Sequence, residues 1–214
     1  MTCKHCCGAD QFFDSKNAEK ELKKYKKKGP KGATKRLISV LNTCDMKQSS
    51  LLDIGGGVGA IQWYALSNGS AKTTDVDASG GYLLTAERYA SENGWEDKSH
   101  FIQGDFTDVA HQVEMHDFVT LDKVICCYPD YRRLLENASA KTSRVMVLSF
   151  PIGGIISRSL SKLAALYFKW KKSPFRTYVH DPRDVHQFIE SRGLKRTEKI
   201  ISFPWNVWAY ERTN

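Results

Sequence analysis

The chain has 214 residues, of which 41% are apolar, and carries a formal net charge of +8. This length suits one α/β domain with additions, and the apolar fraction is sufficient for a sizeable core. No apolar run approaches the roughly 20 residues of a membrane span, and the N-terminus lacks the apolar stretch of a secretory signal, so we expect a cytoplasmic protein.

A cluster of metal-ligand residue types opens the chain: Cys3, His5, Cys6 and Cys7. A structural zinc site takes four ligands and usually has a second C-x-x-C pair downstream, which this sequence lacks. Two interpretations therefore stay open, a metal or redox site and a lightly packed terminus. We assign no metal ligand from the sequence.

The first two predicted elements are helices over about 15–28 and 32–42, separated by Gly29-Pro30. Between Lys20 and Arg36 there are nine basic residues and one acid. Such a patch is typical of contact with nucleic acid, anionic lipid or an acidic substrate. A solvated lysine-rich helix face is the alternative.

Strands and helices then alternate. A strand–turn–helix unit is predicted over 50–68, further strands over about 71–76, 100–102, 117–127 and 144–150, and helices over 79–93 and 132–138. This alternation indicates an α/β fold with a parallel sheet.

The pattern changes after Phe150. Apolar residues at helical spacing predict a helix to about Trp170, Asp181-Pro182 begins another, and two strands over 194–202 and 205–210 read as a closing antiparallel hairpin. We therefore expect a single domain, 1–214. Its parts are a helical N-terminal extension (1–45), a cofactor-binding core (50–150), a substrate lid (151–192) and the closing hairpin (193–214).

The most informative segment is 51–59, an apolar strand that ends in an acid and runs into a glycine-rich turn. Glycines at 55, 57 and 59 permit positive φ angles and close approach of the backbone to a ligand. The helix that follows from about Ala60 points its free N–H groups toward the turn. The segment therefore predicts a bound nucleotide-like cofactor.

Two kinds of cofactor fit the glycines. Gly55, Gly57 and Ala60 satisfy the G-x-G-x-x-[GA] pattern of dinucleotide-binding turns, with Asp77 near the distance expected for a ribose-binding acid. Asp53 favours another cofactor, because a carboxylate beside a pyrophosphate is repelled, whereas a cofactor with a cationic end is attracted.

Residues 53–59 (Asp-Ile-Gly-Gly-Gly-Val-Gly) resemble the first motif of class I S-adenosylmethionine-dependent methyltransferases. Segments 75–79, 104–106 and 117–122 resemble that family's later motifs, in order. The resemblance implies a Rossmann-like, seven-stranded, mostly parallel sheet with helices on both faces, and S-adenosyl-L-methionine as cofactor, with S-adenosyl-L-homocysteine as product. The residues it implies for cofactor binding are Asp53, Gly55, Gly56, Gly57, Gly59, Asp77, Ala78, Asp105, Phe106 and Asp122.

The resemblance also implies individual roles. Asp77 would accept from the ribose hydroxyls, Asp105 would face the adenine amino group and Phe106 would lie beside the adenine ring. Flanking segments at 25–30, 126–130, 175–180 and 205–212 are similar to a bacterial and archaeal group near magnesium-protoporphyrin O-methyltransferases and quinone-biosynthesis methyltransferases. They do not fix a substrate.

We expect the acceptor pocket above the carboxyl ends of the fourth and fifth strands. Tyr25, Tyr128 and the 153–172 helix would wall it, and His180 would bind substrate there. His180 is the candidate base, because histidine titrates near neutral pH, and Tyr128 is the second catalytic candidate. The alternative for His180 is a structural or surface role.

Several alternatives stay open beside a small-molecule methyltransferase. Asp122-Lys123-Val124-Ile125 lacks the prolines and aromatic typical of base amino methylation, but other tRNA or rRNA positions are not excluded. The 158–172 helix interleaves apolar residues with lysines, which fits either peripheral contact with anionic lipid or packing over the pocket. A cofactor-binding protein without catalysis and an NAD-type oxidoreductase complete the alternatives. The acceptor, the methylated atom and the oligomeric state do not follow from the sequence.

Overall fold

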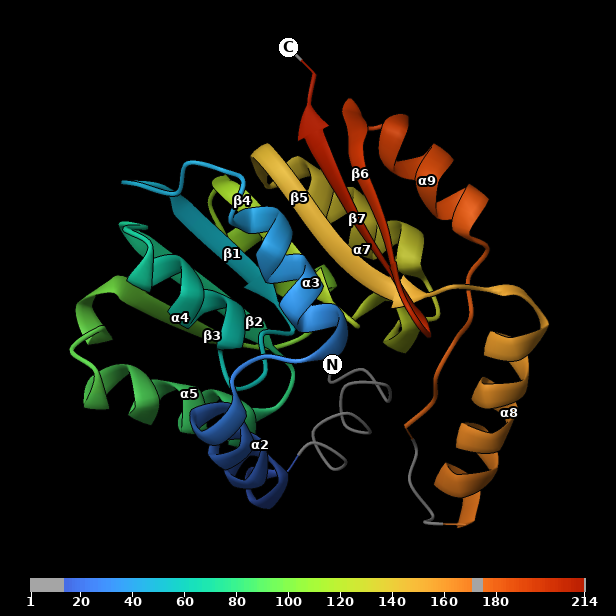
Figure 1. Cartoon of the computed structure of the whole chain (residues 1–214), viewed down its shortest axis with the longest axis horizontal. Helices are drawn as coiled ribbons and strands as arrows, with labels where there is room; N and C mark the ends of the chain where they lie inside the picture. Colours follow the sequence, from blue (N-terminus) through green and yellow to red (C-terminus); the bar gives the residue numbers. More distant parts are fainter. Residues whose placement is uncertain (1–13, 171–174, 214) are drawn as a thin grey trace.

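A seven-stranded sheet organises the fold in the computed structural model, which describes residues 14–170 and 175–213 (Figure 1). The strands are β1 (Ser50–Ile54), β2 (Lys72–Asp77), β3 (Ser99–Gln103), β4 (His116–Asp122), β5 (Thr142–Pro151), β6 (Leu194–Ser202) and β7 (Trp205–Arg212). Their order is β3-β2-β1-β4-β5-β7-β6. The first five strands pair in parallel, whereas β7 is antiparallel to both β5 and β6. The predicted fold class, including the terminal antiparallel hairpin, is confirmed.

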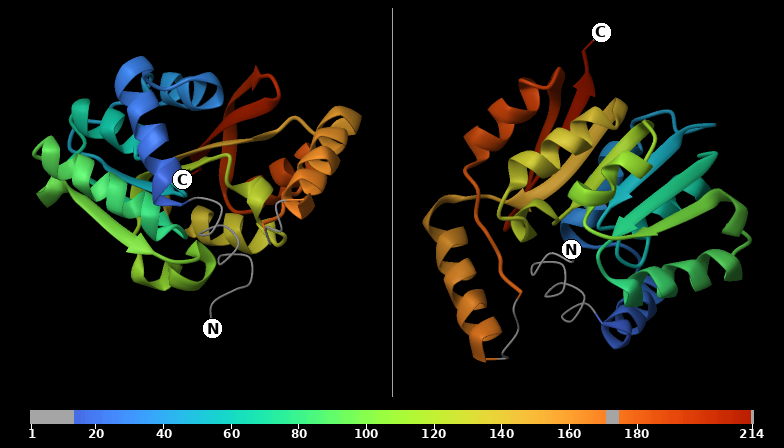
Figure 2. Two further views of the ribbon diagram at one scale, coloured as in Figure 1. Left: turned by 90° about the horizontal axis from the view of Figure 1, so that it is seen from below. Right: turned by 180° about the vertical axis from the view of Figure 1, so that it is seen from behind.

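Helices cover both faces of this sheet, as Figure 2 shows from two further sides. The helices of the described chain are α2 (Ser15–Lys28), α3 (Gly32–Leu41), α4 (Ala60–Ser67), α5 (Gly80–Glu92), α6 (Phe106–Val109), α7 (Tyr131–Ala140), α8 (Gly154–Trp170) and α9 (Pro182–Glu190), with short 3-10 turns η1 (Glu96–Lys98), η2 (Ala110–Gln112) and η3 (Ile125–Cys127). Leu37 of α3 and Ile61 of α4 belong to the core on one face. Leu134 of α7 and Val185 of α9 belong to the core on the other.

Side-chain caps start the helices where the sequence predicts them. Asp14 accepts a hydrogen bond from the Asn17 amide at 2.8 Å at the start of α2. Ser79 accepts from the Tyr82 amide at 3.2 Å at the start of α5. Each cap satisfies an amide that has no partner within its own helix, which explains why the helices begin at these residues.

The fourth strand is shorter than its apolar run. The sequence predicts a strand over 117–127, but β4 ends at Asp122 and the turn η3 follows. Lys123 takes a φ of 63°, which breaks the extended pairing. Ile125 and Cys126 are nevertheless buried, so the apolar run continues after the strand has stopped.

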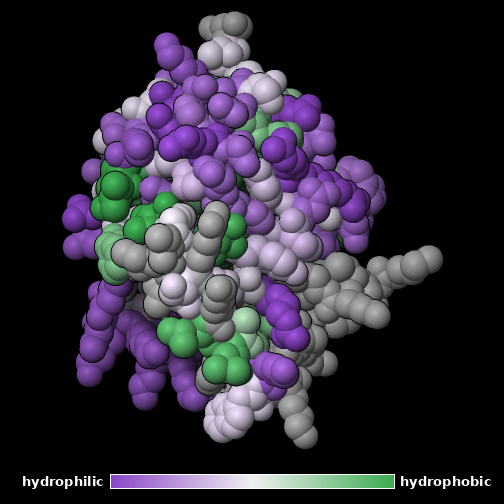
Figure 3. All heavy atoms as spheres, turned by 90° about the vertical axis from the view of Figure 1, so that its right-hand side faces the viewer, coloured by the Kyte–Doolittle hydropathy of each residue, from purple (hydrophilic) through white to green (hydrophobic). Residues whose placement is uncertain are grey.

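Helix α8 lies apart from the helices that cover the sheet (Figure 1). Its side chains Leu163, Leu166 and Trp170 are 64%, 65% and 75% exposed. Hydrophobic side chains are accordingly visible beside hydrophilic ones on this face of the molecule (Figure 3). In the described part of the chain, no helix combines the length and apolarity that crossing a membrane requires.

Candidate active site

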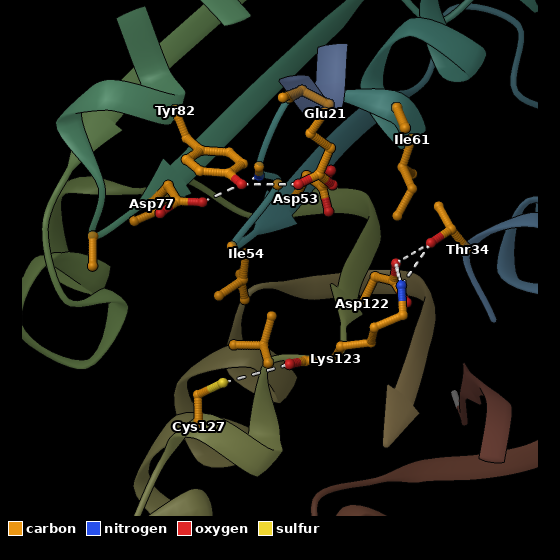
Figure 4. A pocket seen from close by; sticks show the side chains of 18 of the residues that line it. Glu21, Thr34, Asp53, Ile54, Ile61, Asp77, Tyr82, Asp122, Lys123 and Cys127 are labelled. Carbon is orange, nitrogen blue, oxygen red and sulfur yellow. Dashed lines mark hydrogen bonds and ion pairs between the residues drawn. The ribbon is translucent and has the colours of Figure 1, made fainter. Parts of the chain in front are cut away.

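A cavity of about 290 Å³ opens at the carboxyl ends of β1, β2 and β4 (Figure 4). The sheet order reverses between β1 and β4, and open α/β sheets take their ligands at such a point. Among the residues predicted to hold a cofactor, Asp53, Gly55, Gly56, Gly57, Asp77, Ala78 and Asp122 line this cavity.

The glycine turn leaves no room for side chains. A Cβ on Gly55 would lie 2.7 Å from Cγ2 of Val124, and one on Gly56 would lie 2.6 Å from Nε2 of Gln62. Gly55 also has a φ of 68°. The turn therefore needs glycine for both space and conformation, and it presents bare backbone to the cavity.

Asp53, at the end of β1, is completely buried and lines the cavity. Its Oδ1 accepts from the Thr120 hydroxyl at 2.7 Å, whereas its Oδ2 has no hydrogen-bond partner among the described residues. Burial raises the pKa of Asp53 to about 7; the Thr120 and Gln62 side chains oppose this, and the charges of Asp122 and Asp77 add to it. A buried oxygen without a donor is unfavourable, so this site suits a ligand that brings a cationic donor.

Asp77, at the end of β2, is oriented by backbone amides. It accepts from the Gly57 amide at 3.1 Å and from the Ser79 amide at 2.8 Å, one on each carboxylate oxygen. These two amides fix the orientation of the carboxylate, which lines the cavity.

Asp75 holds the glycine turn in place through hydrogen bonds. It is fully buried and accepts from Gln62 Nε2 at 2.7 Å and from the Gly56 amide at 3.2 Å. Burial raises its pKa well above the ordinary value. Sequence reasoning assigned Asp75 no role, and it lies outside the cavity lining.

Asp105 and Phe106 stand at the start of α6. Asp105 caps α6 by accepting from the amide and hydroxyl of Thr107, both at 2.9 Å. Phe106 is 1% exposed and packs in the core. Neither residue lines the cavity, although Gly104 does, and Gly59 shapes the turn without lining it. The predicted contacts of Asp105 and Phe106 with the adenine therefore stay predictions.

Asp122 belongs to a hydrogen-bonded cluster at the end of β4. It accepts from the Thr34 and Ser149 hydroxyls, both at 2.5 Å, and from Lys123 Nζ at 2.9 Å. Thr34 comes from α3 and Ser149 from β5, so the cluster assembles residues far apart in sequence. No local pattern points to Thr34 or Lys123, and sequence reasoning missed both.

The three predicted acceptor-side residues occupy different places. Tyr128 lines the cavity and donates to Asp105 Oδ1 at 3.0 Å. Tyr25 lines a neighbouring cavity instead. His180 lines neither cavity; its Nε2 lies 3.0 Å from the backbone oxygens of both Ile125 and Tyr128. Burial lowers its pKa.

Other lining residues carried no signal in the sequence. Glu21 of α2 reaches the cavity and accepts from the Tyr82 hydroxyl at 2.8 Å. Phe175 also lines it, and its ring packs edge-on against Phe168 of α8, with centroids 5.1 Å apart. Only folding brings these segments to the glycine turn.

Among the described residues, no three His, Cys, Asp or Glu side chains are grouped so that they could hold a metal ion. The cluster of Cys3, His5, Cys6 and Cys7 lies outside the described residues.

Comparison with known families decides what class of protein this is. Residues 52–143 match the family model described as a methyltransferase domain. The chain contains a methyltransferase domain. Such a domain implies S-adenosyl-L-methionine as the methyl donor, and the unpartnered Asp53 oxygen and the bare glycine turn suit that cationic nucleoside.

Solved structures share the methyltransferase fold. The chain is similar to magnesium protoporphyrin IX methyltransferase from Synechocystis PCC 6803, with a TM-score of 0.73, 15% identity, and 96% of this chain and 98% of that chain covered. It also resembles an O-methyltransferase family 2 protein from Planctomyces limnophilus DSM 3776, with a TM-score of 0.66, 16% identity and coverage of 93% and 62%. A search of curated proteins found no match.

Proposed function

We propose that the methyltransferase transfers the methyl group of S-adenosyl-L-methionine to a small molecule. The single observation that carries this proposal is the buried, unpartnered Oδ2 of Asp53 in a cavity floored by a bare glycine turn. Small-molecule acceptors are supported by the similar structures, which include a magnesium protoporphyrin IX methyltransferase and a family 2 O-methyltransferase in complex with apigenin.

The cavity residues divide by chemistry in this proposal. Asp53 faces the cofactor's ammonium group, the carboxylate of Asp77 faces its ribose hydroxyls, and the glycine turn makes room for the rest of the cofactor. When bound, the cofactor supplies a methyl group on a positively charged sulfur, which makes a good leaving group. The protein's own contribution is therefore mainly to bring the acceptor close and to exclude water.

The acceptor side is proposed to be walled by Tyr128, Val124 and Phe175, which line the cavity. The Phe168–Phe175 contact links α8 to this wall, so we assign the segment around α8 the part of a lid. These apolar side chains favour a flat or lipophilic acceptor over a heavily hydrated one.

Calorimetric titration tests the function directly. We expect S-adenosyl-L-homocysteine to bind with one site per chain, and NAD and NADP to give no heat of binding at the same concentrations. The Asp53→Asn variant is the matched control for the site. Binding of NAD without binding of S-adenosyl-L-homocysteine would overturn the proposal.

His180 is proposed to position the acceptor wall rather than to act as the base. Its Nε2 hydrogen faces the carbonyls of Ile125 and Tyr128, so it joins the 175–181 segment to η3. We expect His180→Ala to lower the unfolding free energy by about 1–3 kcal/mol, because two carbonyls lose a buried donor. Urea denaturation at pH 7.5 measures this, and His180→Gln, whose amide can donate to the same carbonyls, should recover part of the loss.

The pH dependence of this stability has a defined sign. Burial lowers the pKa of His180 below 6.5, so the unfolded chain binds the proton more tightly than the folded one. The contribution of His180 is then complete above pH 6.5 and declines as the pH falls below it. If His180 were instead the catalytic base without a structural role, His180→Ala would keep the stability of the wild type and lose its turnover.

A further inference from the structure

A second cavity of about 470 Å³ lies beside the first. Residues of α2, the 29–31 turn, the start of α3 and the glycine turn line it, together with Lys123. The residues that line both cavities are Glu21, Thr34, Val58, Ala60 and Lys123. A molecule in one cavity can therefore extend into the other.

The lining of this second cavity is strongly basic. It contains Lys24, Lys28, Lys31 and Lys123, against the single acid Glu21. Glu21 already accepts from the Tyr82 hydroxyl. Within the described part of the chain, Lys24, Lys28 and Lys31 form no ion pair.

The backbone gathers these positive groups in one place. Lys24 and Lys28 are four residues apart on α2, so they share a face of the helix. Gly29, with a φ of 64°, turns the chain so that Lys31 stands at the N-cap of α3, which has no side-chain cap. The free amides at the start of this ten-residue helix add a further positive end. Like charges held together repel each other, and an anion between them removes the repulsion.

Lys123 stands where the two cavities meet. Its backbone amide is held by the Ser149 carbonyl at 3.1 Å and the Ser149 hydroxyl at 2.9 Å, which keeps it in its left-handed conformation. Its Nζ donates to Thr34 Oγ1 and Asp122 Oδ2, both at 2.9 Å. An ammonium has three hydrogens, so one is left to donate to a ligand.

We propose that this lysine cavity anchors an anionic group, a carboxylate or a phosphate, of the methyl acceptor. The anion lies among Lys24, Lys28 and Lys31, and the rest of the acceptor passes Lys123 toward the first cavity. Tyr25 lines the same cavity, and burial raises the pKa of its hydroxyl to about 12, so the hydroxyl stays protonated and keeps a hydrogen to donate. This inference rests on the proposed function, because it names the class of acceptor for the same site.

The test uses the full chain saturated with S-adenosyl-L-homocysteine and three small probes of similar shape: benzoate, phenyl phosphate and benzamide. Titration calorimetry at constant ionic strength measures their dissociation constants. We expect at least one anionic probe to bind about ten-fold more tightly than neutral benzamide, because charge-assisted hydrogen bonds are stronger than neutral ones. The benzoate and phenyl phosphate arms decide between a carboxylate and a phosphate.

Two double variants separate the cavity from the general charge of α2. Lys28→Gln/Lys31→Gln removes two lining lysines, and we expect it to weaken the anionic probe about ten-fold while leaving the affinity for S-adenosyl-L-homocysteine within about two-fold. Lys23→Gln/Lys27→Gln removes the same charge from exposed residues outside the lining, and we expect it to change little.

Each other outcome overturns the inference in a recognisable way. Equal weakening in both double variants would assign the effect to overall charge, as for a nucleic acid partner. Weakened binding of S-adenosyl-L-homocysteine in Lys28→Gln/Lys31→Gln would assign the lysines to the cofactor's own carboxylate. Absence of anion binding to a protein that binds S-adenosyl-L-homocysteine would refute this inference alone. Failure of the wild type to bind S-adenosyl-L-homocysteine would refute the proposed function.

Discussion

Asp53→Asn is expected to lower the affinity for S-adenosyl-L-homocysteine by about 10- to 150-fold, since a buried hydrogen bond to a charged group contributes about 1.5–3 kcal/mol. The substitution keeps the size of the side chain but removes the carboxylate whose Oδ2 has no partner within the described residues. Titration calorimetry at pH 8 measures the loss. Asp117→Asn is the matched control. Asp117 lies near the start of β4, whereas the cavity lies at the other end of that strand, so this variant should bind as the wild type does.

The Asp53→Asn variant should be at least as stable as the wild type at pH 8. The folded-state pKa of Asp53 is raised from 3.8 to about 7, so the folded chain binds this proton more tightly than the unfolded chain. The folded protein therefore loses stability as the pH rises toward 7 and Asp53 ionises. Asparagine does not ionise, so the variant avoids that loss. Urea denaturation would show this, and a large loss of stability in Asp53→Asn would contradict it.

The affinity for S-adenosyl-L-homocysteine should depend on pH through the ionisation of Asp53. The ligand's ammonium group needs Asp53 ionised, so the affinity of the wild type for S-adenosyl-L-homocysteine should rise as the pH increases from 6 to 8, through the pKa of about 7. The Asp53→Asn variant should bind with nearly constant affinity over that range. A wild-type affinity that falls with increasing pH would refute the assignment of Asp53 to the ammonium group.

The second large effect is expected for Gly59→Ala, which should lower the stability of the protein. Gly59 has a φ of 79°, and a Cβ there would lie 2.4 Å from the Trp63 ring. We expect the unfolding free energy to fall by about 2–5 kcal/mol, the sum of left-handed strain and overpacking. Trp63 cannot move aside easily, because it is 1% exposed, donates to the Val58 carbonyl at 2.7 Å and stacks on Trp95.

Gly94→Ala is the control for this experiment. Gly94 has a similar φ of 68°, but nothing lies within 4 Å of the position of its Cβ. Only the conformational strain remains, so we expect a loss of about 1–2 kcal/mol. Equal losses in the two variants, measured by urea denaturation, would show that the Trp63 contact does not constrain the turn.

Local signals account for the elements that sequence reasoning placed well. The caps at Asp14 and Ser79 act within three residues of themselves, and the glycine turn depends on backbone angles that few other residues adopt. Such effects are readable from neighbouring residues alone. The end of β4 was misplaced because a buried 3-10 turn and a buried strand both present an apolar run.

The amino-acid sequence by itself determined the parallel sheet, the glycine turn and the acids at the ends of its strands, because each depends on short-range patterning. Tertiary structure alone decided that Asp53 keeps an unpartnered oxygen, that the Phe106 ring packs into the core, and that His180 binds two backbone carbonyls. It also brought Lys24, Lys28 and Lys31 into one cavity with Lys123. These outcomes depend on how distant elements pack, and no local pattern records which side chains will then meet.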